Sequence, residues 1–385
     1  MAFTPNDSDW NVTWPQANVK MPLAWNLTRG SRHVVVAVVD TGINPRIKDF
    51  KGAIVPGKDF VAGGYTQADE DGHGSLVSSI IAARGNNGTG IPGYCWTCKV
   101  MPVRVAVGTE FDTDVAAQGI RWAVDHGANI ITLSWSEADS SPDPNVASAI
   151  AYAARQGVLV LVSAGNTGST GYTYPAADPG AYAVAGTNKF GQLSRSNQWA
   201  TTYGSWIHLA ASGCQLALDQ TGNGISPCGS SVAAPAVAGI AGLMLSVNPS
   251  LTPGQIISIL ESTARPVAGI AGGQVNAYAA ILAAVTKAAL SAGGQPVRLN
   301  RLLGNRWNLG VALQGQRVVA TLRSSKARSC SLSLAAPDAV WLTSKRGRRA
   351  ASLVARVSSG KYRLAVSCKR HRLQAASLTL RAFSH

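Results

Sequence analysis

The chain has 385 residues, of which 46% are hydrophobic and 14% charged, and this length predicts two domains rather than one core. The composition is typical of a soluble globular protein, and its 40 glycines argue against long coiled helices. The net charge of +15 is uneven: residues 288–385 hold 18 Lys and Arg and one acidic residue, whereas the remainder holds 16 basic and 18 acidic residues.

The N-terminal residues 3–10 are polar and lack the basic and apolar regions of a secretory leader. We therefore expect a mature form, or a fragment whose leader lies upstream. The longest apolar run, residues 232–247, is 16 residues long and contains one proline and two glycines. It predicts a buried helix, and we expect no segment to span a membrane.

Strands and helices are expected to alternate over the first 250 residues. The β-branched run 34–39 predicts a buried parallel strand that ends at Asp40. Similar strands are expected at residues 99–107, 129–133, 158–163 and 181–186, with helices at 73–83, 113–126, 144–156 and 231–247. This alternation predicts an α/β fold with a doubly wound, mostly parallel sheet and helices on both faces. Functional sites in such sheets gather at the carboxyl ends of strands.

The composition changes near residue 290. We expect a first domain over residues 1–288 and a linker over 289–296, which is rich in Gly and ends in Pro. Residues 297–385 contain short segments that alternate apolar with polar residues. This pattern predicts a small, basic, all-β domain resembling a β-sandwich.

Six cysteines form three local pairs, which are Cys95/Cys98, Cys214/Cys228 and Cys330/Cys368. The even count predicts disulfides and an oxidising, extracellular location, so we expect a secreted protein. The alternative for Cys95 and Cys98 is a redox or metal motif. Zinc would need further ligands, and neither a second pair of this spacing nor a neighbouring His supplies them.

Four polar residues are candidates for acyl-transfer chemistry, which needs a nucleophile, a base, a group that orients the base and donors for the oxyanion. Asp40 ends the first strand, and His73 begins a predicted helix. Asn166 follows a strand, and Ser231 begins the apolar helix. Each alone has a structural alternative: a turn residue for Asp40 and Asn166, a solvated loop His for His73 and a helix N-cap for Ser231.

Four motifs carry a resemblance: VAVVDTGI around Asp40, GHGS around His73, SAGN around Asn166 and GSSVAAPAVAG around Ser231. In order and local sequence they resemble the subtilisin-like serine proteases over residues 4–285. Residues 4–7 and 202–206 resemble the thermitase-like group of that family. The resemblance implies that residues 1–288 form a peptidase domain. It further implies a triad of Asp40, His73 and Ser231, with Asn166 in the oxyanion hole.

The chain departs from the family pattern at several positions. Leu76 and Ala236 replace histidines that do not transfer protons, and Ser230 replaces a threonine. The resemblance implies that substrate is bound by Ser134, Trp135, Ser136, Glu137, Ala164 and Gly165, where Ser136 and Glu137 replace two glycines. We expect broad endopeptidase cleavage after medium-sized apolar P1 residues, with Trp135 as a wall for P4. Basic P1 residues facing Glu137 are the alternative.

A structural Ca²⁺ is also implied by the resemblance. Its ligands would be the side chains of Asp7, Asp49 and Asn87 and the backbone carbonyls of Arg84, Thr89 and Ile91. Six oxygens from separate segments suit this cation. The alternative is that residues 85–88 form only a turn.

The expected partners are protein or peptide substrates, and we expect a monomer. The basic C-terminal domain favours an anionic polymer such as a cell-wall polymer, an acidic polysaccharide or, least of all, nucleic acid. The alternative is a solvated basic surface without a ligand. Two other functions remain open: a catalytically silent binding module of the same fold, and a serine esterase of another fold. The esterase would need a G-x-S-x-G elbow, whereas Ser231 is followed by Val232 and Ala233.

Overall fold

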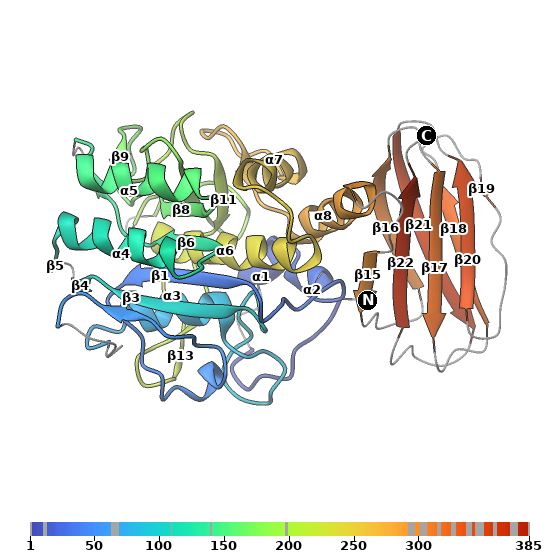
Figure 1. The fold of residues 1–385 in the computed structure, drawn as a ribbon, viewed down its shortest axis with the longest axis horizontal. Coiled ribbons are helices and arrows are strands. Elements are labelled where there is room, and N and C mark those ends of the chain that lie inside the picture. The colour runs from blue at the N-terminus through green and yellow to red at the C-terminus, as the bar shows by residue number, and fades with distance from the viewer. Residues whose placement is uncertain are drawn as a thin grey trace.

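The computed structural model describes residues 2–10, 14–62, 69–108, 110–138, 141–196 and 199–291, and the backbone of eight strands between residues 297 and 383. Side chains are described as far as residue 287, except those of Phe111, Glu137 and Ala138. Figure 1 shows a layered body that contains α1–α8 and, beyond α8, the C-terminal strands.

The body is built on an eight-stranded sheet in which every neighbouring pair is parallel. Across the sheet the strands are β14 (Gly273–Gln274), β11 (Leu209–Ser212), β10 (Ala181–Thr187), β8 (Leu159–Ser163), β6 (Ile130–Leu133), β1 (Val35–Asp40), β3 (Lys99–Arg104) and β2 (Lys58–Asp59). This confirms the predicted α/β fold. The strands β2, β11 and β14 were not predicted, because each is only two to four residues long.

Helices cover both faces of the sheet, as predicted (Figure 1). On one face lie α3 (His73–Ala82) and α6 (Ser230–Val247), and on the other lie α4 (Thr113–Asp125) and α5 (Pro144–Arg155). The alternation of side chains along β1 explains the two cores, because Val36 and Val38 pack in the first and Ala37 and Val39 in the second. The outer helices α7 (Pro253–Thr263) and α8 (Ala277–Ser291) extend the first core.

The remaining short elements are α1 (Trp14–Asn18), α2 (Met21–Ala24) and the 3₁₀ turn Lys48–Phe50. Three antiparallel pairs of two-residue strands complete the body: β4 (Ala106–Val107) with β5 (Glu110–Phe111), β7 (Glu137–Ala138) with β9 (Thr173–Tyr174), and β12 (Ala217–Leu218) with β13 (Gly224–Ile225).

The central helix α6 tests the expectation that residues 232–247 form a buried helix and not a membrane span. Its 18 residues have a mean hydropathy of 1.7, so by length and composition it could cross a membrane. However, 83% of these residues are buried inside the protein, where they contact β6, β8, β10 and β11. We therefore assign α6 to the core, in agreement with the predicted buried helix. Among the described residues it is the single helix of that length and apolarity.

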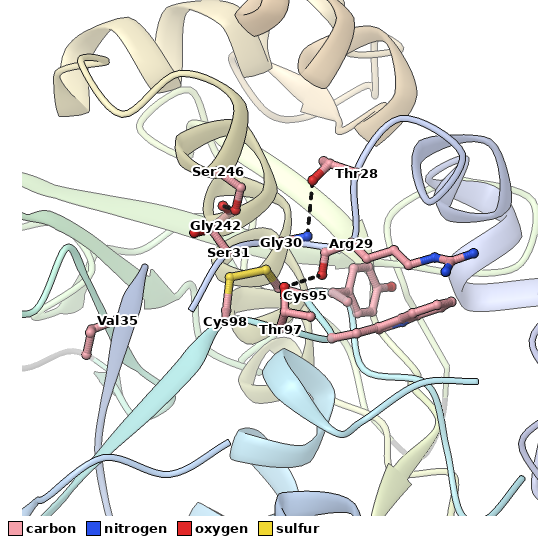
Figure 2. The surroundings of a disulfide bond; sticks show 12 residues. Thr28, Arg29, Gly30, Ser31, Val35, Cys95, Thr97, Cys98, Gly242 and Ser246 are labelled. Carbon is pink, nitrogen blue, oxygen red and sulfur yellow. Dashed lines mark hydrogen bonds between the residues drawn. A yellow bond between two sulfur atoms is a disulfide. The ribbon is translucent and has the colours of Figure 1, made fainter. Parts of the chain in front are cut away.

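Cys95 and Cys98 form a disulfide that is wholly buried (Figure 2). The turn that it closes is tied to the preceding segment, because the Thr97 amide donates to the Arg29 carbonyl at 3.1 Å. Between the two cysteines, Trp96 packs against Trp25 with ring centroids 4.9 Å apart. The pairing leaves no thiolate for a metal, so the metal alternative is wrong.

The described C-terminal strands are β15 (Val297–Asn300), β16 (Arg306–Leu313), β17 (Arg317–Ser324), β18 (Ser329–Ala335), β19 (Trp341–Leu342), β20 (Ala350–Arg356), β21 (Gly360–Lys369) and β22 (Ala376–Phe383). They pair antiparallel in the orders β15-β22-β17-β20 and β16-β21-β18-β19. Helix α8 continues to Ser291, across the first part of the predicted linker, and residues 292–296 lie outside the described residues. Cys330 and Cys368 are opposite each other in the backbone register, but their side chains lie outside the described set and their disulfide stays a prediction.

Asp178 is an unusual buried carboxyl group in the turn between β9 and β10. It is 2% exposed, and within the described part of the chain neither of its carboxyl oxygens has a hydrogen-bond partner. Burial, assisted by the charge of Asp143, raises the pKa of Asp178 to about 6. The unfolded chain binds the proton less tightly, so ionisation of this group costs folding stability as pH rises from about 4 to 6.

We predict that Asp178→Asn raises the free energy of unfolding at pH 8, by on the order of 2 kcal/mol, because the substituted chain no longer buries a charge. At pH 4, where the carboxyl group is protonated, the gain should disappear. Denaturant melts at both pH values test this. Asp219→Asn is the control: hydrogen bonds, first that from Thr221, lower the pKa of Asp219, so its loss should not stabilise the protein at pH 8. Equal effects of Asp178→Asn at both pH values would contradict the prediction.

Candidate active site

The topology of the sheet brings polar residues together at one edge. After β1 the chain first builds β2 and β3 on one side and then continues with β6 and β8 on the other. A crevice is therefore expected outside the carboxyl ends of β1 and its neighbours. A cleft of about 460 Å³ lies there. It is lined by Asp40, Thr41, Asp71, His73, Ala106, Gly108, Ser134, Trp135, Ser136, Ser163, Gly165, Asn166, Ser230 and Ser231.

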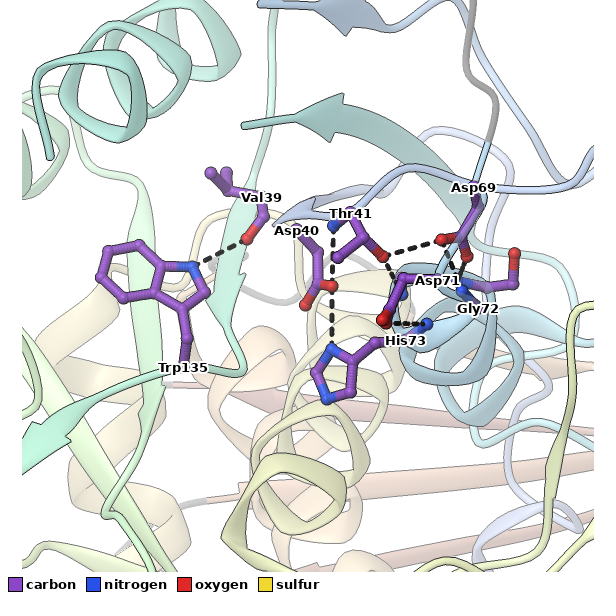
Figure 3. Close-up of polar contacts among 10 residues, drawn as sticks. Val39, Asp40, Thr41, Asp69, Asp71, Gly72, His73 and Trp135 are labelled. Carbon is purple, nitrogen blue, oxygen red and sulfur yellow. Dashed lines mark hydrogen bonds and ion pairs between the residues drawn. The ribbon is translucent and has the colours of Figure 1, made fainter. Parts of the chain in front are cut away.

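Asp40 and His73 are hydrogen-bonded within this cleft, with 2.8 Å between Asp40 Oδ1 and His73 Nδ1 (Figure 3). Asp40 is the last residue of β1 and is 3% exposed, whereas His73 is the first residue of α3 and its side chain is 33% exposed. A carboxylate can only accept, so Nδ1 carries the proton in this pair. The neutral ring therefore keeps Nε2 as its basic nitrogen.

Asp69 and Thr41, which were not predicted as site residues, support this pair. Asp69 Oδ1 accepts from the Thr41 hydroxyl and the Gly72 amide, both at 2.8 Å, and Oδ2 accepts from the Ser75 amide at 2.7 Å (Figure 3). Asp69 thus binds amide groups at the start of α3 and holds them against the end of β1. An acidic residue just before a helix start was the available signal.

Carboxylates around His73 raise its pKa to about 9. Asp40 is the main cause, through its charge and its hydrogen bond, and burial of the ring opposes it. Asp71 and Asp69 add smaller contributions of the same sign. Asp71 is exposed, and its Oδ1 accepts from the His73 backbone amide at 3.1 Å. The neutral form of His73 is therefore populated mainly at alkaline pH.

Asn166 and Ser231 face each other across the start of α6. Asn166 Oδ1 accepts from the Ser230 amide at 2.8 Å, which fixes the side chain and leaves its Nδ2 donor groups for the cleft. A Cβ atom at Gly229 would lie 3.4 Å from Asn166 Nδ2 and 3.2 Å from Ser231 Oγ. Glycine at this position keeps the space between the amide and the hydroxyl open. Within the described residues no hydrogen bond joins Ser231 to His73, and such contacts are often long without substrate.

A second disulfide, Cys214–Cys228, lies next to this segment. Cys228 directly precedes Gly229, whose amide donates to the Gly213 carbonyl at 2.7 Å. The disulfide and this hydrogen bond fasten the chain before Ser230 and Ser231 to the end of β11. Both described disulfides agree with the predicted pairs.

The predicted substrate-binding residues divide into three groups. Ser134, Trp135, Ser136 and Gly165 line the cleft, and the Trp135 indole is fixed by a 3.0 Å hydrogen bond to the Val39 carbonyl (Figure 3). Ala164 is fully buried, and both its amide and its carbonyl are bonded inside the protein. The backbone of Glu137 pairs with Tyr174 in β7 and β9, and its side chain lies outside the described residues.

The predicted calcium ligands come together away from the cleft. Asp7 and Asp49 are buried, at 6% and 2% exposure, on either side of the loop that contains Asn87. Asp7 Oδ2 accepts from the Asn86 amide at 2.7 Å, and Asp49 Oδ1 accepts from Asn87 Nδ2 at 2.9 Å. The loop thus wraps around two neighbouring carboxylates.

The donor set fits a hard cation. Burial raises the pKa of Asp7, and the charge of Asp49 adds to this effect. Within the described residues neither carboxylate has an ion-pair partner, since the Arg84 guanidinium binds the backbone carbonyls of Lys51, Gly52 and Trp96 instead. Two buried carboxylates without a cation are unfavourable, and a bound Ca²⁺ would compensate them. Side-chain and carbonyl oxygens of residues 84–91 could complete the coordination. The described residues contain no cluster of three or more His, Cys, Asp or Glu, so carboxylates alone would not suffice.

Comparisons with known proteins agree with this geometry. The model of the subtilase family, the S8 peptidases, matches residues 31–305. Thermitase of Thermoactinomyces vulgaris is 35% identical over 286 residues, which cover 72% of this chain and 99% of thermitase. Subtilisin Savinase of Lederbergia lenta is 33% identical over 276 residues, covering 70% and 98% of the two chains.

Solved structures give the same result. A protease from Pseudoalteromonas arctica superposes with a TM-score of 0.65 at 30% identity, covering 73% of this chain and 99% of its own. The family match spans most of the chain and includes the Asp40–His73 pair, Asn166 and Ser231. The chain therefore belongs to the subtilase family of serine proteases.

Proposed function

We propose that the chain is an endopeptidase that hydrolyses peptide bonds of proteins through an acyl-enzyme, with Asp40, His73 and Ser231 as its triad. The observation that carries the proposal is the 2.8 Å Asp40–His73 hydrogen bond in a cleft that Ser231 and Asn166 also line. Only with an ordered base and a hydroxyl in one cleft can a serine attack a peptide carbonyl at useful rates.

In the acylation step, Ser231 Oγ attacks the scissile carbonyl carbon and His73 Nε2 takes the hydroxyl proton. The resulting imidazolium is stabilised by Asp40, which holds its Nδ1–H. His73 then gives the proton to the leaving amine, and a water molecule repeats the sequence to release the acyl group. The start of α6 favours negative charge near Ser231 through its helix dipole.

The oxyanion of the tetrahedral intermediate would be bound by Asn166 Nδ2 and by the backbone N–H of Ser231. Support comes from the hydrogen bond between the Ser230 amide and Asn166 Oδ1, which orients the donor end of the amide before substrate binds. Such preorganisation means that the donors need not reorient as charge develops.

For specificity we propose broad cleavage with apolar P1 residues favoured. Ser134, Trp135 and Ser136 would flank an extended substrate on one side and Gly165 on the other, with Ala164 acting only as buried support. Basic P1 residues facing Glu137 are the alternative. A catalytically silent binding module remains the second candidate function, and the altered segment Ser136–Glu137 is the feature that favours it.

We further propose a structural Ca²⁺ held by Asp7, Asp49 and Asn87 with the carbonyls of Arg84, Thr89 and Ile91. When bound, the ion would neutralise the two carboxylates and fix the N-terminal segment to residues 84–91. It would take no part in peptide hydrolysis.

Residues 297–385 are proposed to form a separate, small all-β domain after a short linker at 289–296, with residues 1–288 as the catalytic domain. Its charge, with 18 basic residues and one acidic residue from 288 onward, suits an anionic polymer outside the cell. Secretion is supported by the two described disulfides. We propose that the enzyme acts as a monomer on protein or peptide substrates.

We predict that Ser231→Ala lowers kcat on a casein or peptide substrate by roughly 10⁴-fold or more, because the nucleophile is lost while the fold persists. A fluorophosphonate probe should label the wild-type protein at Ser231 and leave the variant unlabelled. Ser226→Ala, a change at an exposed serine nearby, is the control and should keep both the wild-type kcat and the labelling at Ser231. Wild-type protein that is folded but neither labelled nor active would instead support the silent module.

The raised pKa of His73 predicts an alkaline enzyme, because only the neutral ring accepts the Ser231 proton. We expect kcat/KM to rise with pH through an apparent pKa near 9. Removing a nearby negative charge destabilises the imidazolium, so Asp71→Asn should move the rising part of the pH profile of kcat/KM to lower pH by a few tenths of a unit.

Glu70→Gln is the matched control for this prediction. Glu70 is adjacent to Asp71 but is paired with Arg104 and is not among the main causes of the raised His73 pKa, so the pH profile of Glu70→Gln should match the wild type. If the Asp71→Asn profile stays in place or moves to higher pH, the electrostatic account of the base is wrong.

Chelation should lower the melting temperature of the calcium-loaded protein. A ligand that binds only the folded state stabilises it by about 2.7 kcal/mol at 100 times its Kd, and excess EDTA removes this contribution. Added Ca²⁺ should restore the transition. Asp49→Asn should abolish the response to EDTA, whereas Asp9→Asn, in the same N-terminal region as Asp7, should retain it. A wild-type melting temperature unchanged after prolonged EDTA treatment would contradict the site.

A further inference from the structure

The wall of the cleft beside Asn166 determines which side chain can precede the scissile bond, provided that the proposed peptidase function holds. The P1 side chain leaves the carbon that is bonded directly to the carbonyl under attack. If Asn166 Nδ2 holds that carbonyl oxygen, P1 must enter the cleft next to Asn166. The neighbouring lining residues on that side are Gly165 and Ser136.

Gly165 marks how deep this part of the cleft can be. Its φ of +90° suits glycine, and a Cβ built there would lie 3.0 Å from Thr173 Cγ2, 2.9 Å from Thr202 Oγ1 and 3.3 Å from Ser136 Oγ. Three side chains from separate segments therefore converge directly behind Gly165. A long side chain in P1 finds this space already filled.

Thr173 cannot easily move out of the way. It is 1% exposed, and its hydroxyl donates to the Ala164 carbonyl at 2.9 Å. With the hydroxyl held there, the methyl group Cγ2 is the part that points to Gly165. The backbone of Thr173 is also fixed, because β9 pairs with β7, Ala138 being opposite Thr173. A bound rotamer in a paired strand gives a rigid wall.

We infer that Thr173 and Ser136 restrict P1 to small side chains, with Ala and Ser preferred over Leu, Phe and Tyr. This limit is smaller than the medium-sized apolar residue that the sequence predicts. It also differs in cause, because the sequence predicts a limit at the rim formed by Ser136 and Glu137, whereas the structure places Thr173 behind Gly165. Thr173 determines specificity because its methyl group fills the space behind Gly165. Its hydroxyl, which is bonded to the Ala164 carbonyl, holds that methyl group in place.

The test is kcat/KM on quenched peptides that differ only at P1. The wild-type protein should cleave after Ala at least about tenfold better than after Phe, a ratio within the range that pocket size can impose. Thr173→Gly removes the wall and should reduce the Ala-to-Phe ratio by about tenfold or more. Thr173→Ser, which removes only the methyl group and keeps the bond to Ala164, should reduce it less and guards against a folding defect in the glycine variant.

Two control variants distinguish the effect of side-chain volume at Thr173 from other effects of the substitutions. Thr173→Val retains the bulk and loses the hydroxyl, so its P1 ranking should stay that of the wild type. Thr170→Gly makes the same substitution at an exposed threonine three residues earlier and should leave the ranking unchanged.

Fluorophosphonate labelling of Ser231 in the same samples distinguishes a failure of the P1 size limit from a failure of the proposed peptidase function. Wild-type protein that is labelled but prefers Phe, Tyr or Leu at P1 would overturn the size limit and leave the peptidase intact. An unchanged ratio in both Thr173→Gly and Thr173→Ser would also overturn it. Wild-type protein that is neither labelled nor active would remove the proposed function, and the inference with it.

Discussion

The hydrogen bond between Asp40 and His73 connects two elements that are distant in the sequence and meet at one point of the fold. β1 delivers the carboxylate at its end, and α3 delivers the imidazole at its first residue. The bond has the correct length only if the end of the strand and the start of the helix keep a fixed distance. Thr41 and Asp69 maintain that distance through buried hydrogen bonds that satisfy the first amides of α3. The site therefore depends on helix capping as much as on the two acid–base groups.

The acidic residues around the imidazole have two opposing effects on catalysis. A carboxylate at Nδ1 orients the ring and stabilises the charged form that catalysis creates. The same negative field keeps the ring protonated before substrate arrives, which lowers the fraction of active enzyme at neutral pH. Because Asp71 is exposed, its contribution is open to screening by salt, whereas that of buried Asp40 is not.

The parts of the molecule that could be predicted from the sequence are those whose structure is determined by the local pattern of residues. Runs of Val and Ile gave the long strands, and apolar periodicity gave α3, α4, α5 and α6 within one residue at each end. Asp40, His73, Asn166 and Ser231 stood in motifs that are readable without a fold. The short strands β2 and β14 were not predicted, because a two-residue strand is defined by its neighbours and not by its own pattern.

Thr173 was missed for a different reason. A threonine between two tyrosines, in a strand of only two residues, has no local signal, and its position behind Gly165 exists only once β7 and β9 have paired. The missing information was tertiary.

The burial of α6 has a consequence for how activity is lost. The helix that begins at Ser230 and contains Ser231 contacts five strands and two helices, and nearly all of its side chains are enclosed. Amides in such an element exchange with solvent only when the whole domain opens, whereas edge segments exchange through small local fluctuations. We therefore expect the nucleophile to lie in the slowest-exchanging unit, and the two-residue pair β7–β9, which is rigid in the folded enzyme, to open earlier on the way to unfolding. Heat or denaturant should therefore loosen substrate selection before it displaces Ser231, so that discrimination between substrates declines earlier than turnover.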